Sequence, residues 1–171
     1  MHGAVWLCLC IPVYVWLNDW TNQLALQIPH IHDVVYLYSP FAWVLVQCVG
    51  VVAVVACVYS RPDWNVLCTR LAIGYALKGV TQWVTIVPQP RMHGGAEACR
   101  GVPWWHVHGC ADMMFSGHTM FTMLVLYKYK WRGCAVFAMA FELVFSKMHY
   151  ISDCVMAVVV CCAVESWIPH L

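Results

Sequence analysis

The chain has 171 residues, of which 63% are hydrophobic and only 10% are charged, with a formal net charge of +1. A soluble domain has about 25% charged residues, so this composition argues against an ordinary soluble protein. The near-neutral charge also argues against binding of nucleic acid. Because the apolar residues are spread along the whole chain, we predict a membrane protein that crosses the bilayer several times.

Six apolar segments follow one another along the sequence, and most approach the ~20 residues that a membrane-spanning helix needs. They cover about residues 4–22, 34–59, 65–87, 112–128, 132–149 and 150–168. The first resembles the apolar part of a signal sequence, but no basic residue precedes it and no clear cleavage site follows, which favours a retained span. The predicted fold is therefore a single all-α membrane domain over residues 1–171, a bundle of six transmembrane helices.

Basic residues in the short loops predict how this bundle is oriented, because Lys and Arg accumulate on the cytosolic side. Two loops on one side carry four of them: Arg61, Lys128, Lys130 and Arg132. The opposite loops carry Arg91 and Arg100, partly offset by Glu97. The opposite side, which contains the starts of the fourth and sixth segments, is therefore expected to be lumenal or exoplasmic.

Most of the 11 cysteines lie inside the apolar segments, where they are best interpreted as small apolar residues. Cys99 and Cys110 lie in a polar stretch instead. If that stretch is lumenal, they are placed to form a disulfide.

Two short stretches combine residues that suit phosphoryl transfer. His118 follows Ser116 and Gly117 at the start of the fourth segment, and His149 precedes Asp153 by four residues at the start of the sixth. Four residues is about one helical turn, so His149 and Asp153 share a helix face. We predict that Asp153 fixes the tautomer of His149, which attacks phosphorus through its other ring nitrogen, while His118 acts as acid and then as base.

The residues around His118 are suited to hold a phosphate group. Gly117 permits a close approach of the backbone. Amide groups at the start of this helix, together with the hydroxyls of Ser116 and Thr119, are expected to bind phosphate oxygens. The structural alternative is a set of polar side chains that only cap two helix ends.

Two basic residues lie inside the third segment, where a charge is costly and usually functional. Arg70 is near the predicted cytosolic end and is able to extend to that interface. Lys78 is two turns further along. The sequence leaves open which of the two contacts the substrate.

The pattern C-x-D-x-x-x-S-G-H-T at residues 110–119, followed by H-Y-x-x-D at 149–153, resembles the sphingomyelin synthase-like lipid transferases. These form a branch of the type 2 phosphatidic acid phosphatase superfamily. The resemblance extends over about residues 24–168. Two weaker stretches agree with it: Arg70 with TQWVTIVPQP at 81–90, and PHIHD at 29–33.

The resemblance implies a two-step transfer of a phospho-headgroup from one membrane lipid to another. Phosphatidylcholine is the implied donor and ceramide the implied acceptor, with diacylglycerol as an alternative acceptor in a cholinephosphotransferase. It also implies that Asp112 orients the loop before His118, that no metal or other cofactor takes part, and that a homo-oligomer is possible. The implied membranes are those of the Golgi, the endoplasmic reticulum or the cell surface.

One departure separates the branches of this superfamily. The phosphatases carry an arginine shortly before the second histidine, whereas residues 142–148 here contain only Lys147 as a basic residue. This favours a transferase over a lipid phosphate phosphatase. Glu142 lies seven residues before His149 and is a candidate to bind a cationic headgroup or to pair with Lys78.

A hypothesis from another class is a metal-binding membrane protein. Nitrogen and sulfur ligands would come from a group of histidines and one cysteine. These are His30, His32, His93, His106, His108 and Cys110. Their spacing is a weak signal beside the paired motifs at His118 and His149.

Overall fold

The computed structural model describes residues 2–25, 40–84, 115–146 and 148–168. These residues form helices and connecting turns, and no strand occurs among them. The prediction of an all-α fold is confirmed. The helices are α1 (His2–Ala25), α2 (Pro40–Tyr59), α3 (Trp64–Val84), α4 (Gly117–Val125), α5 (Arg132–Phe145) and α6 (Ile151–Trp167).

Each predicted apolar segment corresponds to one helix, but two helices are shorter than expected. The segment predicted at 112–128 contains only the nine-residue helix α4, because Ser116 caps its start and Leu126 ends it. The segment predicted at 132–149 ends as a helix at Phe145. Ser146 and residues 148–150 lie between α5 and α6.

Within the part of the chain that the structure describes, no helix is both long enough and apolar enough to qualify as a membrane span. The described residues form six helices, so the helical part of the prediction is confirmed. The placement of these helices across a membrane belongs with the proposals below.

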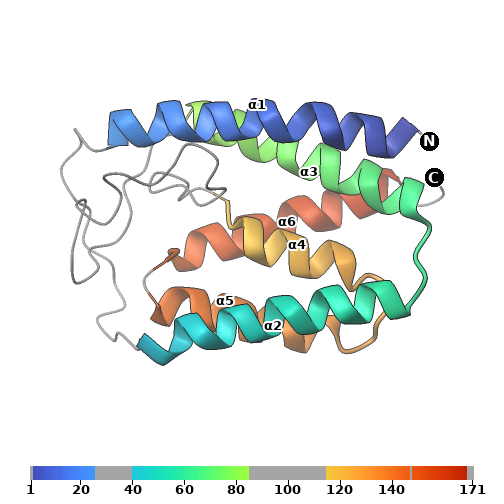
Figure 1. The fold of residues 1–171 in the computed structure, drawn as a ribbon. Coiled ribbons are helices and arrows are strands. Elements are labelled where there is room, and N and C mark those ends of the chain that lie inside the picture. Colours follow the sequence, from blue (N-terminus) through green and yellow to red (C-terminus); the bar gives the residue numbers. More distant parts are fainter. Residues whose placement is uncertain (1, 26–39, 85–114, 147, 169–171) are drawn as a thin grey trace.

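Helix α4 is the centre of the bundle. It contacts α2, α3, α5 and α6, while α1 packs along α3 (Figure 1). Met120 and Leu124 of α4 are completely buried and pack with Ala53 of α2 and Ala157 of α6. Burial of such side chains contributes about 1.5–3 kcal/mol each when the transfer from water is complete. The short helix α4 is thus stabilised mainly by packing against its neighbours, because an isolated helix of this length is not stable in water.

Polar contacts join the helices at the end of the bundle where α4 ends. Lys128 Nζ donates a hydrogen bond to the carbonyl of Arg61 at 3.1 Å. Arg132 pairs with Glu165 at 2.7 Å and so connects α5 to α6. Arg61, Lys128 and Arg132 belong to the four basic residues that predicted a cytosolic side. The bond from Lys128 to Arg61 brings the connection between α4 and α5 against the connection between α2 and α3.

Glycine allows α3 and α4 to approach closely at one point. A Cβ added to Gly74 would lie 2.6 Å from the Met120 sulfur, which is closer than real Cβ contacts. Gly50 of α2 is a matched comparison, because nothing lies within 4 Å of a Cβ added there.

We predict opposite results for the same substitution at these two glycines. Gly74→Val should destabilise the protein by about 1–3 kcal/mol because it overpacks the α3–α4 contact. Gly50→Val should leave stability unchanged or raise it by a few tenths of a kcal/mol, since valine has a higher helix propensity than glycine. Unfolding followed by circular dichroism measures both, and equal midpoints would contradict the importance of the Gly74 contact.

Candidate active site

Ser116 determines how α4 begins. It is the N-cap of the helix, with extended backbone angles, and its hydroxyl accepts a hydrogen bond from the Thr119 amide at 3.2 Å. The Thr119 hydroxyl donates to the same oxygen at 2.9 Å, and both residues are buried. A serine at this position satisfies an amide that the helix itself leaves without a partner. Gly117 and His118 therefore occupy a rigid first turn.

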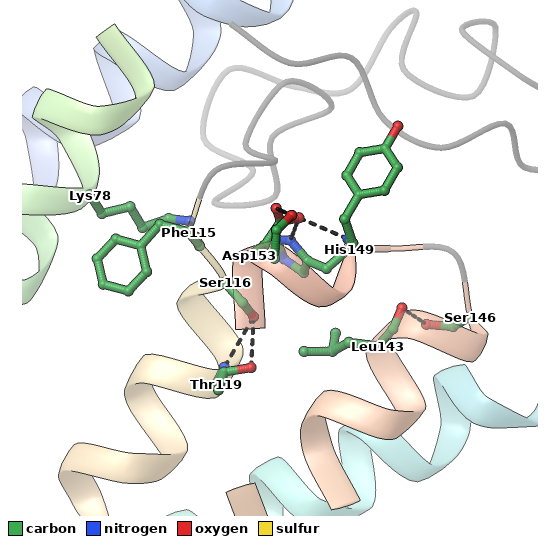
Figure 2. A network of polar contacts seen from close by, with 10 residues as sticks. Lys78, Phe115, Ser116, Thr119, Leu143, Ser146, His149 and Asp153 are labelled. Atoms are coloured by element: carbon green, nitrogen blue, oxygen red, sulfur yellow. Dashed lines mark hydrogen bonds and ion pairs between the residues drawn. The ribbon is translucent and has the colours of Figure 1, made fainter. Parts of the chain in front are cut away.

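A tight corner positions His149 between α5 and α6. Ser146 ends α5, and the carbonyl of Leu143 accepts hydrogen bonds from the amides of Met148 at 3.0 Å and His149 at 3.3 Å. Tyr150 then caps α6, and its amide donates to Asp153 Oδ2 at 2.8 Å. These local contacts fix the backbone on both sides of His149, and Figure 2 shows the Ser146 hydroxyl bonded to the Leu143 carbonyl before it and the contacts of Asp153 after it.

His149 and Asp153 form a buried pair. Nδ1 of His149 lies 3.2 Å from Asp153 Oδ2, and the two side chains are 6% and 1% exposed. The Ser152 hydroxyl donates to the other carboxylate oxygen at 3.2 Å. Because the carboxylate accepts from Nδ1, the pair favours the tautomer with its proton on Nδ1, and Nε2 is then the nucleophilic or acceptor nitrogen.

The structure brings the two histidines together. The ring centroids of His118 and His149 are 6.5 Å apart, and the ring planes are inclined by 68°. A backbone hydrogen bond of 3.1 Å from the Ser116 amide to the Asp153 carbonyl holds the start of α4 against the start of α6. The two imidazoles therefore lie close to each other at the starts of α4 and α6.

Lys78 lies beside the same helix start. Its side chain is 1% exposed, and its ammonium group donates to the carbonyl of Phe115. The nitrogen also lies 5.7 Å from the ring centroids of Phe115 and Tyr14. A Cβ added to Gly117 would be 3.3 Å from Lys78 Cε. The absence of a side chain at Gly117 therefore gives the Lys78 side chain the space that it occupies.

Arg70 lies at the other end of α4. Its Nη2 donates to the carbonyl of Ile168 at 2.9 Å, and its guanidinium carbon is 5.1 Å from the centroid of the Tyr127 ring. The sequence left Arg70 and Lys78 as alternatives, and the structure brings Lys78, not Arg70, to the start of α4. Arg70 instead connects the N-terminal part of α3 with the C-terminal ends of α4 and α6.

Glu142 lies on α5, one turn before the corner. Its Oε2 is buried and has no hydrogen-bond partner among the described residues. The predicted roles for Asp112, Lys147 and the disulfide of Cys99 with Cys110 concern residues outside the described part of the chain. The same holds for the histidines and Cys110 of the metal hypothesis, and the described residues contain no cluster suited to a metal ion.

Two residues of the site were not predicted from the sequence. Tyr14 on α1 contacts Lys78, and Cys154 on α6 lies near the Thr119 and Ser116 hydroxyls. Cys154 directly follows Asp153, so its proximity to the motif was available as a signal. No local pattern marks Tyr14, because only the packing of α1 on α3 brings it near.

No known protein family has a model that matches this chain, and no curated protein matches it.

We predict that the Ser116 cap contributes to stability as well as to geometry. Ser116→Ala should lower the free energy of unfolding by about 1 kcal/mol, because the Thr119 amide loses its partner in a buried position. Ser166→Ala is the control, since that exposed hydroxyl only donates to a carbonyl of its own helix and the change should stay within about 0.5 kcal/mol. Denaturant unfolding measures both variants. Equal losses of unfolding free energy would contradict a stabilising role for the Ser116 cap.

Proposed function

We propose that this protein is a lipid phosphotransferase that moves a phospho-headgroup through a covalent intermediate on His149. The observation that carries the proposal is the buried His149–Asp153 pair facing His118 at 6.5 Å between ring centroids. A histidine oriented by a carboxylate is an activated nucleophile, and a second histidine nearby supplies the proton transfers.

In the first step, Nε2 of His149 attacks the phosphorus of the donor phosphodiester. A P–N bond forms, and the P–O bond to the diacylglycerol oxygen breaks. Protonated His118 gives its proton to that oxygen, so neutral diacylglycerol leaves. Asp153 stabilises the positive charge that develops on the His149 ring, as the carboxylate of a catalytic triad does.

In the second step, His118 accepts the proton of an acceptor alcohol, and the alcohol oxygen attacks the phosphorus. The P–N bond breaks and His149 returns to its starting form. His118 is protonated again and ready for the next donor, so the protons balance over the cycle. Residues of this chain perform each proton transfer.

Lys78 and the start of α4 are suited to bind the phosphate oxygens. The ammonium group is held against the Phe115 carbonyl, one residue before the Ser116 cap. Amides at a helix start favour an anion, and a fixed positive charge beside them stabilises the negative charge of the transition state. This role for Lys78 depends on its position, which Arg70 does not share.

The apolar surface of the bundle supports a location in a lipid membrane. Large apolar side chains face outward on several helices, including Trp16 of α1 (66% exposed), Phe41 of α2 (77%) and Phe137 of α5 (72%). Soluble monomers rarely expose large contiguous apolar surfaces. We therefore propose that the bundle lies in a membrane with its site lumenal or exoplasmic, and that it transfers phosphocholine from a glycerophospholipid to ceramide or a related alcohol.

The covalent step gives a prediction about the donor half-reaction. Without acceptor, the purified protein should release one diacylglycerol per site in a burst and retain the phospho-headgroup on His149. His149→Ala should abolish the burst, and Asp153→Asn should slow it by roughly 100-fold or more, since an amide stabilises cationic imidazole poorly. Rapid-quench analysis of released diacylglycerol measures it.

A donor with a better leaving group separates the roles of the two histidines. It should restore much of the burst to His118→Ala, whose missing acid is then less needed, and none to His149→Ala. Equal rescue of both variants would contradict the assigned roles. A free phospho-headgroup, released because water and not an alcohol lipid is the acceptor, would identify a hydrolase of the phosphatase type.

Lys78 and Arg70 form a matched pair for testing the phosphate site, because both are buried cations on α3. Lys78→Met should reduce donor turnover by roughly 100-fold, as removal of a transition-state donor does. Arg70→Met should lower stability but leave kcat per folded protein within a few fold, since Arg70 contacts Tyr127 and Ile168. Turnover and unfolding midpoints of both variants decide, and a larger kinetic loss for Arg70→Met would reverse the assignment.

A further inference from the structure

A groove of about 590 Å³ lies between α5 and α6. Its lining is apolar apart from Arg132, whose guanidinium pairs with Glu165. Several lining side chains are exposed although they are large and apolar, among them Phe141 and Val155. Met123 of the central helix α4 also lines the groove and is almost completely buried. The groove therefore presents an apolar surface that reaches inward to the core.

One end of the groove adjoins the candidate active site. Phe145 and Ile151 line it, and they stand on either side of the corner that holds His149. Cys154 lines it as well, and its thiol lies near the Ser116 and Thr119 hydroxyls. The groove thus begins where the phosphate of a substrate would be held.

The dimensions of the groove fit a single extended chain. Phe145 and Gly133, which both line it, are twelve residues apart on α5, or about 18 Å along the helix axis. A hydrocarbon chain joined to a phosphate at the histidines would enter the groove at its Phe145 end.

We propose that this groove binds one acyl chain of the lipid substrate, with the lipid headgroup at His149 and the chain end near Gly133. The inference rests on the proposed function, because the substrate must be a lipid whose phosphate is at the histidines. The apolar lining receives the hydrocarbon, and burial of each CH2 group favours binding. The groove length then limits the chain length that the protein accepts.

Two tryptophan substitutions place a plug at different depths. Ala140→Trp blocks the groove about 8 Å from its His149 end, and Gly133→Trp blocks it at about 18 Å. Cys134→Trp is the control, because Cys134 is exposed, adjoins Gly133 and does not line the groove. Each protein is assayed with phosphatidylcholines that differ only in acyl chain length.

Gly133→Trp should reduce kcat/KM roughly tenfold or more for long-chain donors and leave short-chain donors unchanged. Ala140→Trp should move this cut-off to shorter chains, and Cys134→Trp should behave as the unsubstituted protein does. Normal kinetics with short-chain donors show that a plugged variant is folded. A uniform loss over all chain lengths in both plugged variants, or no loss, would overturn the proposal.

A binding measurement separates failure of the groove from failure of the proposed function. His149→Ala is illuminated with phosphatidylcholine that carries a diazirine at one acyl chain end, and labelled residues are mapped. Label on the groove should exceed that on the outward residues Val51 and Val55 of α2, which report surrounding lipid. Adding Gly133→Trp should remove the excess, whereas adding Cys134→Trp should not.

The two experiments give distinct outcomes. Groove labelling in a protein without headgroup transfer would reject the phosphotransferase and keep the groove as a lipid site. Transfer without groove labelling and without a chain-length effect would keep the enzyme and reject the groove. An unlabelled groove with a disulfide-linked dimer of Val155→Cys would assign this face to a second copy and also reject the proposal.

Discussion

The backbone hydrogen bond from the Ser116 amide to the Asp153 carbonyl joins the two helix starts on which the site depends. Asp153 is 1% exposed. Its carboxylate pairs with His149, while its backbone carbonyl accepts the hydrogen bond from Ser116 at the start of α4. One residue thus orients the candidate nucleophile and aligns it with His118. Without this bond, α4 would be positioned relative to α6 by side-chain packing and by the longer hydrogen bond from the Cys161 thiol to the Met120 carbonyl at 3.8 Å.

The buried ammonium group of Lys78 is the second constraint at the site. A charge removed from water needs compensating partners, and here the Phe115 carbonyl and two aromatic rings supply them. This arrangement occupies the space next to Gly117 and keeps a positive charge beside the amides of the α4 start. It is a natural place for an anionic group of a substrate, and it makes Gly117 a steric requirement.

The apolar exterior and the polar site belong to one arrangement. The groove between α5 and α6 connects them, because Cys154 lies near the Ser116 and Thr119 hydroxyls and also lines the groove. A substrate with a phosphate head and a hydrocarbon chain would satisfy both environments at once. A free, fully polar phosphate ester would leave the apolar groove empty.

The sequence by itself determined the six helical segments and the local geometry of the motifs. His149 and Asp153 are one turn apart, and Ser116 caps the turn that contains Thr119, so short-range helix geometry places both pairs. Membrane crossing was also predicted from composition, but the described structure confirms only the all-helical bundle. Tertiary structure alone decided that Lys78 rather than Arg70 joins the motifs, since their partners, Phe115 and Ile168, are 37 and 98 residues away in sequence. It also brought Tyr14 to Lys78 and opened the groove beside α6, because packing between helices, unlike a helical turn, depends on the whole chain.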